Sequence, residues 1–131
     1  MRTVKDVEHI HYILIDEFGG SNGIRDRNGL EAALARPYAT FDQKELYPTA
    51  VEKAAAIFES IIINHPFIDG NKRTAYVLMR LILLEAGLNI VASQEEKYKM
   101  IISASKGEMR FDGIKTWLDS KTRKSNTQIS R

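Results

Sequence analysis

The residues best suited to chemistry lie within one short stretch, residues 65–74. His65 supplies a base and Asp69 a carboxylate. A helix is expected to start at Asn71, and the unpaired N–H groups and positive dipole end of a helix start favour anionic groups, phosphate above all. Lys72 and Arg73 would add positive charge at the same place. A base beside a phosphate-binding helix start predicts transfer chemistry on a phosphorylated substrate.

Each residue type suggests a role in such a reaction. His65 is the candidate catalytic base, because neutral imidazole is available near pH 7 to accept a proton from an attacking hydroxyl. Asp69 is the candidate Mg²⁺ ligand, since Mg²⁺ usually takes one or two protein carboxylates and shares phosphate oxygens. A purely structural alternative reads the stretch as a turn followed by a helix cap. The candidate phosphate- and nucleotide-binding residues are Gly70, Asn71, Lys72 and Arg73. Asn71 is also expected to cap the helix and hold the loop.

The order of these residues resembles the Fic/Doc superfamily. The Fic branch has the pattern His-x-Phe-x-(Asp/Glu)-Gly-Asn-Gly-Arg-x-x-Arg. Lys72 stands here in place of the second glycine, and Tyr76 in place of the last arginine. Both differences are similar to the Doc (death-on-curing) branch, whose pattern is His-x-Phe-x-(Asp/Asn)-(Ala/Gly)-Asn-Lys-Arg. The positions that match the Fic pattern are His65, Phe67, Asp69, Gly70, Asn71 and Arg73, and segments 23–26, 29–37 and 38–41 extend the resemblance to roughly residues 3 to 120.

The resemblance implies a toxin-type protein kinase. It would transfer the γ-phosphate of ATP, with Mg²⁺, to a Ser or Thr hydroxyl of a host protein of the translation elongation factor Tu class and so block translation. In the Fic branch a glycine at the position of Lys72 opens a backbone anion hole and AMP is transferred, whereas Doc-like proteins with lysine there bind the nucleotide the other way round. A Fic-type AMP or nucleotidyl transferase acting on a protein hydroxyl is the alternative. A catalytically silent homologue that only binds an antitoxin is another.

Control of the activity is expected to come from a separate partner. No Ser or Thr is followed four residues later by Glu and then Gly or Asn, which is the pattern of the inhibitory helix of many Fic proteins. The resemblance therefore implies a Phd-like antitoxin, whose disordered segment would fold onto an exposed, apolar groove of this protein.

Composition and charge limit the remaining classes. The 131 residues are 44% hydrophobic and 27% charged, which fits one globular domain. The chain has no cysteine, which excludes disulfides and cysteine metal sites, and its net charge of +2 is too small to predict autonomous nucleic-acid binding. No signal-peptide pattern is present, and the longest apolar run, residues 77–84, is too short to span a bilayer. A cytoplasmic, soluble protein without membrane contact is expected.

The elements that must position the motif are predicted to be helices. Apolar spacing and capping residues predict helices over residues 4–18, 28–36, 50–64, 71–86, 94–106 and 111–121, with weak strand character over 88–92. The helix over 71–86 is apolar on almost every side, which predicts that it lies at the centre. The fold class is therefore all-α, a compact bundle of six to seven helices around a central buried helix, with a domain over 1–121 and a flexible basic tail over 122–131.

Four further expectations concern residues outside the motif. Residues 38–48 are irregular, and the resemblance implies that they form a flap that docks the target beside the active site; a plain surface connection is the alternative. His9 and His11 are two residues apart and do not share a helix face, so they are predicted to be structural or surface residues and not metal ligands. Arg80, seven residues after Arg73 on the same helix face, is expected to pair with a carboxylate; the alternative is that it reaches the site. On the helix over 94–106, the side chains expected to point inward are Tyr98, Ile101 and Ile102.

Overall fold

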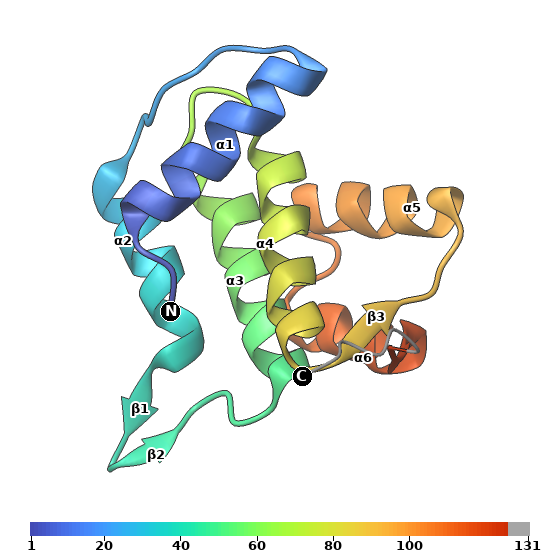
Figure 1. Ribbon diagram of the computed structural model, residues 1–131. Coiled ribbons are helices and arrows are strands. Elements are labelled where there is room, and N and C mark those ends of the chain that lie inside the picture. The colour runs from blue at the N-terminus through green and yellow to red at the C-terminus, as the bar shows by residue number, and fades with distance from the viewer. Residues whose placement is uncertain (126–131) are drawn as a thin grey trace, which may run out of the picture.

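The computed structural model describes residues 1–125 and is built mainly of helices (Figure 1). The predicted all-α class is confirmed, with six α-helices, one short 3-10 helix and two small antiparallel strand pairs over these residues. In chain order the elements are α1 (Val4–Phe18), α2 (Arg27–Ala35), η1 (Arg36–Tyr38), β1 (Thr40–Phe41), β2 (Lys44–Glu45), α3 (Ala50–Asn64), α4 (Asn71–Glu85), β3 (Leu88–Ile90), α5 (Gln94–Ser105), α6 (Phe111–Lys121) and β4 (Thr122–Lys124).

Side-chain caps fix where most of the helices begin. Capping boxes start α1 at Thr3, α3 at Thr49 and α5 at Ser93, as their sequence patterns predict. The start of α2 differs from the predicted helix over 28–36, because Asp26 is the cap and accepts a hydrogen bond from the Gly29 N–H at 2.9 Å. Asp26 has extended backbone and its own N–H donates to Pro66 O at 3.0 Å, so it is held in the conformation that a cap requires.

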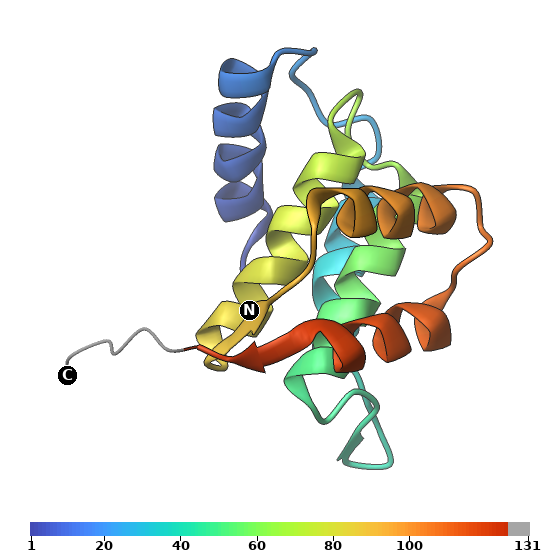
Figure 2. The same ribbon diagram turned by 90° about the vertical axis from the view of Figure 1, so that its right-hand side faces the viewer.

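The centre of the bundle is the pair α3 and α4, which run side by side in both views (Figures 1 and 2). The helix over 71–86 lies at the centre, as predicted, but it is not the most buried element, because α3 buries nine of its 15 residues and α4 buries six. The small side chains of residues 54–56 allow α2, η1 and α6 to approach α3 from several sides. In contrast, α4 leaves Leu84 36% exposed.

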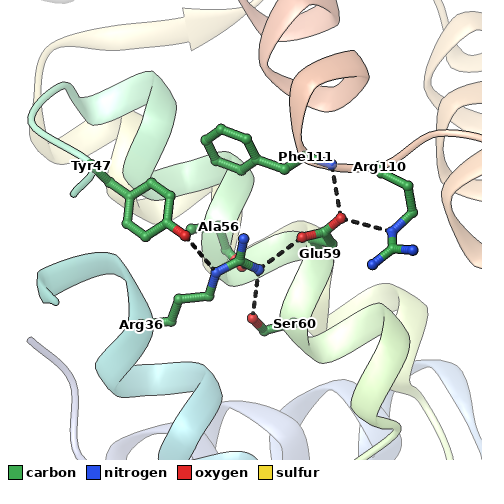
Figure 3. A network of polar contacts seen from close by, with 7 residues as sticks. All are labelled: Arg36, Tyr47, Ala56, Glu59, Ser60, Arg110 and Phe111. Atoms are coloured by element: carbon green, nitrogen blue, oxygen red, sulfur yellow. Dashed lines mark hydrogen bonds and ion pairs between the residues drawn. The ribbon is translucent and has the colours of Figure 1, made fainter.

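A polar network around the buried carboxylate of Glu59 joins α3 to its neighbours (Figure 3). Glu59 of α3 accepts hydrogen bonds from Arg36 Nη1 at 2.8 Å, Arg110 Nε at 2.9 Å and the Phe111 N–H at 2.8 Å. Arg36 also donates to the Tyr47 hydroxyl at 3.0 Å. Burial raises the pKa of Glu59, but the hydrogen bonds to Arg36 and Arg110 outweigh it and leave that pKa below its ordinary value. The network therefore fastens η1, the segment before α3 and the start of α6 to one carboxylate.

The hairpin β1–β2 lies at the N-terminal end of α3, away from the motif (Figure 1). His65 follows the C-terminal end of α3, and 15 helical residues at about 1.5 Å each separate the two ends by about 22 Å. The structure thus differs from the expectation of a flap beside the site. The cause is the length of α3, which begins directly after this segment.

The chain closes with a second strand pair. β4 pairs antiparallel with β3, with Leu88 opposite Lys124 and Ile90 opposite Thr122. Backbone bonds from Val91 N to Lys121 O at 2.7 Å and from Ser125 N to Gly87 O at 2.8 Å extend the ladder. Residues 122–124 of the expected tail therefore form a strand, while residues 126–131 lie outside the described part of the chain.

Several exposed side chains differ from the expected pattern. Of the three side chains expected to point inward from α5, Tyr98 is 65% exposed, whereas Ile101 is partly buried and packs against the core. The fully buried residues of α5 are Met100 and Ala104. Arg80 is exposed and makes no ion pair with any residue among 1–125, so the predicted pairing is wrong. None of the helices formed by these residues has the length and apolar character needed to cross a membrane.

Candidate active site

The motif loop begins where α3 ends, and its first residue is His65. His65 has left-handed backbone, with φ 48° and ψ 56°, and its N–H donates to Ile61 O at 3.1 Å. Arg25 binds the end of the helix: its Nε donates to His65 O at 2.9 Å and its Nη2 to Asn64 O at 2.8 Å, with a further contact from Nη2 to His65 O. One guanidinium thus occupies the carbonyl groups that a helix end leaves without partners, and it fixes the backbone of the candidate base.

A second support is the segment that precedes α2. The N–H groups of Arg25 and Asp26 both donate to Pro66 O, at 2.7 and 3.0 Å, and Ile68 N donates to Gly23 O at 3.0 Å. Ile24 and Phe67 form an antiparallel bridge between the two segments. The loop therefore rests along most of its length on residues 23–26. In the sequence these residues form part of the family resemblance, but nothing in their types predicts that they contact the motif loop.

The third support is His11 on α1. Its ring is 2% exposed and stacks on the Phe67 ring, with 4.0 Å between centroids and 6° between planes. Its Nε2 lies 2.7 Å from Asp69 O, and because a carbonyl oxygen can only accept, this nitrogen carries the hydrogen. His11 is structural, as predicted, and it also positions the motif. The signal available in the sequence is its place in the buried stripe Val7, His11 and Ile15.

Asn71 holds the loop from within. Its Oδ1 accepts from the Phe67 N–H at 2.9 Å, and its Nδ2 donates to Phe67 O at 2.9 Å. It does not cap α4, because Gly70 occupies the cap position with φ 76° and without a side-chain bond. A Cβ at Gly70 would lie 3.1 Å from Ile15 Cδ1, so this turn needs a glycine both for its conformation and for its space.

Five of the six predicted site residues line one cavity of about 230 Å³. They are joined there by Ser105, which nothing in the sequence indicated, and the set is His65, Asp69, Gly70, Asn71, Lys72 and Ser105. Arg73 does not line this cavity. Its guanidinium lies over the Phe18 ring, 4.2 Å from the centroid, because consecutive residues of a helix point about 100° apart. Lys72 borders both the cavity and the neighbouring groove that Arg73 lines.

Asp69 can bind a cation while it supports the loop. Its Oδ1 accepts from the Gly70 N–H at 2.8 Å and its Oδ2 from the Ser21 N–H at 3.2 Å. Each carboxylate oxygen has a second acceptor position. No group of three or more His, Cys, Asp or Glu side chains suited to a metal occurs among residues 1–125. A single carboxylate nevertheless fits Mg²⁺, which takes its other ligands from phosphate and water.

The site therefore combines an exposed imidazole, a carboxylate, a lysine and the start of a buried helix around a small cavity. The first three amides of a helix have no partner inside it, so those of α4 are available to phosphate oxygens. Such an arrangement suits removal of a proton from a hydroxyl beside a bound phosphate. An all-α fold that presents this motif between its two central helices defines the Fic/Doc class.

The comparison with known families agrees with this class. The model of the Fic/DOC family matches residues 2–83, well over half of the chain. The chain belongs to the Fic/DOC family, and the membership predicted from the motif is confirmed.

Two kinds of relative share the matching region. Toxin Doc of Mycolicibacterium smegmatis is 43% identical over 75 residues, which is 57% of this chain and 58% of that protein. Protein adenylyltransferase fic-1 of Caenorhabditis elegans is 33% identical over 73 residues, 53% of this chain and 14% of that protein. The protein of the same name from Caenorhabditis briggsae is 32% identical over 73 residues, with the same coverage. The chain thus spans less than two thirds of each relative.

Proposed function

We propose that this chain is a Doc-type toxin that acts as a protein kinase, transferring the γ-phosphate of ATP to a Ser or Thr hydroxyl of another protein. The observation that carries the proposal is the presence of Lys72 in the cavity of His65. A lysine there adds a cation and fills part of the space that a glycine would leave open to the nucleotide. The 43% identity to Toxin Doc supports the same branch.

The proposed reaction is a direct phosphoryl transfer. His65 takes the proton of the target hydroxyl as its oxygen bonds to the γ-phosphorus, and the bond from that phosphorus to the β–γ bridging oxygen breaks. ADP leaves with that bond's electron pair. Lys72 and the amides at the start of α4 neutralise the phosphate oxygens during the transfer. Mg²⁺, held by Asp69, would supply further positive charge to the same oxygens.

The second candidate is nucleotidyl transfer, which the two adenylyltransferase relatives favour. In that reaction the hydroxyl oxygen bonds to the α-phosphorus as His65 takes its proton. The bond from that phosphorus to the α–β bridging oxygen breaks, and pyrophosphate leaves with its electron pair. The same base and cavity serve both reactions. The nucleotide lies in opposite directions in the two, and this difference makes them separable by experiment.

The test is incubation of the protein and a cell extract with ATP labelled at either the γ- or the α-phosphate. We expect label on protein from γ-labelled ATP only, and none with His65→Ala. The matched control is His9→Ala, an exposed histidine of α1 outside the cavity, which should retain full transfer. Label from α-labelled ATP alone would establish the second candidate, and full activity of His65→Ala would refute both.

The target and partner follow from the branch. We infer a target of the translation elongation factor Tu class, a Phd-like antitoxin and action in the cytoplasm, where translation occurs. Purified elongation factor Tu should become labelled, and induction of the toxin without its antitoxin should arrest growth. Arrest that persists in His65→Ala would instead indicate a catalytically silent protein that acts by binding.

A further inference from the structure

Residues 65–68 of the motif loop have no backbone N–H group left for a partner. Three of them carry an N–H, and each donates to α3, to Asn71 or to Gly23 at 2.9 to 3.1 Å, while Pro66 has none. The carbonyl groups of residues 65–67 also accept hydrogen bonds within the protein. Addition of a strand needs free N–H groups along an edge. A protein substrate must therefore be recognised here through side chains.

The loop has one exposed side chain without a chemical role. Pro66 and Phe67 are buried, which leaves His65, Ile68 and Asp69 at the surface. His65 and Asp69 take part in the proposed reaction, whereas Ile68 does not, although it lines the same cavity and is 58% exposed. A single exposed isoleucine is ordinary on a protein surface. One at the rim of a reaction cavity will touch whatever molecule reacts there.

Ile68 is held in place despite its exposure. Its N–H donates to Gly23 O at 3.0 Å, and the bridge between Ile24 and Phe67 ties the neighbouring residue to the same segment. The side chain lies across Gly23, because a Cβ added to that glycine would lie 2.7 Å from Ile68 Cδ1. The glycine thus leaves the space that the isoleucine occupies. A side chain already fixed in this way loses little conformational freedom when a partner covers it.

The separation of Ile68 from the candidate base limits which part of a substrate it can contact. Three residues of extended chain span at most about 10 Å, so Ile68 lies within about that distance of His65. Consecutive residues of a substrate are about 3.8 Å apart. When the acceptor hydroxyl is at His65, a side chain one or two residues from the acceptor is therefore within reach of Ile68. Ile62, the other apolar residue that lines the cavity, is buried and forms part of its wall.

We propose that Ile68 determines specificity for the protein substrate, and that it selects a Ser or Thr with an apolar side chain, such as Val, Ile, Leu or Phe, within two residues of it. This rests on the proposed function in taking a protein hydroxyl as the acceptor, and it holds whichever phosphate of ATP is transferred. A charged side chain in that place would lose hydration against Ile68 without gaining a partner there, so it is selected against.

The first test maps the sites that the protein modifies in a library of peptides made by digesting a cell extract, and in the intact extract in parallel. Mass spectrometry identifies each modified Ser or Thr, whether it carries a phosphoryl or an adenylyl group, and His65→Ala gives the background. We expect apolar residues within two positions of the modified residue to be several-fold more frequent than around the unmodified Ser and Thr of the same samples. Equal frequencies would overturn the proposal.

The second test changes the preference by substitution. Ile68→Glu should replace the apolar preference with one for Lys and Arg, because a carboxylate at the rim pairs with cations. The matched control is Ile13→Glu, at an isoleucine of α1 that is 47% exposed and lies outside the cavity, and it should keep the apolar preference. Urea unfolding of both variants checks that they fold. An apolar preference that persists in folded Ile68→Glu would contradict the proposal.

A third measurement tests the contact itself and does not depend on Ile68→Glu. For one mapped substrate, Ile68→Ala should lower kcat/KM about tenfold, the low end of the range for an apolar contact because this one stays partly open to water. Replacing the apolar neighbour in the substrate by Ala should lower the wild-type value similarly and leave that of Ile68→Ala unchanged; additive losses would refute the contact.

The outcomes separate this inference from the kinase activity. Adenylyl groups on sites with apolar neighbours would refute only the kinase, and phosphoryl groups on sites without such neighbours would refute only the role of Ile68. The absence of any modified site from both samples would refute both.

Discussion

The hydrogen bond from His11 to Asp69 O offers a direct test of how the motif loop is held. The substitution His11→Phe keeps a ring that can stack on Phe67 but removes the only donor to that carbonyl given by the described residues. His11→Gln does the reverse, because its amide can donate but cannot stack. Together the two variants separate the hydrogen bond from the ring contact.

The size of the effect follows from the contacts. A hydrogen bond of this kind contributes about 0.5–1.5 kcal/mol, and a stacked aromatic pair a similar amount beyond its buried area. If that energy serves to hold the loop in its active geometry, removal of the hydrogen bond lowers the transfer rate by about two- to tenfold, since about 1.4 kcal/mol is tenfold. His11→Phe should therefore lose activity together with about 1 kcal/mol of folding stability.

The assay is the initial rate of label transfer, paired with urea unfolding of the same preparations. His9→Phe is the matched control, because His9 is an exposed histidine on the same helix. Wild-type activity in His11→Phe would refute a positioning role. A loss of stability with unchanged activity would show that the contact serves only the fold.

Three further outcomes are expected from the polar network and the glycines. Glu59→Gln should lower the unfolding free energy by about 1.5–3 kcal/mol, because it removes the charge of a buried carboxylate that accepts hydrogen bonds from Arg36, Arg110 and the Phe111 N–H. Glu85→Gln, at an exposed pair, should cost about 0–1 kcal/mol; equal losses would contradict the importance of burial. Because the folded pKa of Glu59 is lowered, its stabilisation is present above the ordinary value of 4.5 and is lost as pH falls through the folded pKa, so acid unfolding curves should be steeper below pH 4.5 for the wild type than for Glu59→Gln. Gly70→Ala and Gly87→Ala both place alanine at a positive φ, 76° and 78°, and each should lower the unfolding free energy by about 1–2 kcal/mol. Only Gly70→Ala, where the added Cβ meets Ile15, should also lose transfer activity. Equal activities of the two variants would argue against the close approach of Ile15 to Gly70.

Much of the fold could be predicted because local signals are strong in this chain. Thr3, Thr49 and Ser93 each lie immediately before the first residue of a helix, so these caps give the starts of α1, α3 and α5 correctly. The helix over 111–121 was also placed correctly, from its apolar spacing. Each of these signals depends on residues within one or two turns of each other, and such signals are legible in a sequence.

The supports of the site could not be predicted in the same way. Arg25 and His11 act on backbone carbonyl groups, and a carbonyl acceptor leaves no trace in the type of the residue that carries it. The three-residue strand β4 is too short to show alternation, and it forms only because β3 lies opposite. In contrast, the different directions of the Lys72 and Arg73 side chains could have been predicted, because consecutive residues of a helix point about 100° apart.

The distance of the hairpin from the motif was equally implicit in the sequence. A helix of 15 residues between the two segments must carry them apart, whatever family they resemble. The segment that does lie against the motif, residues 23–26, contributes backbone groups and the Arg25 guanidinium. The resemblance included this segment, but its residue types did not predict these contacts.

The left-handed backbone of His65 lowers the folding stability of the protein at the position of its candidate base. Left-handed residues at helix ends are most often glycine, and a residue with a Cβ is disfavoured there by about 1 kcal/mol or more. Selection for folding stability alone would favour glycine at this position. His65→Gly should accordingly unfold at a higher temperature than the wild type but show no transfer activity. Folding stability and catalysis would then favour different residues at position 65.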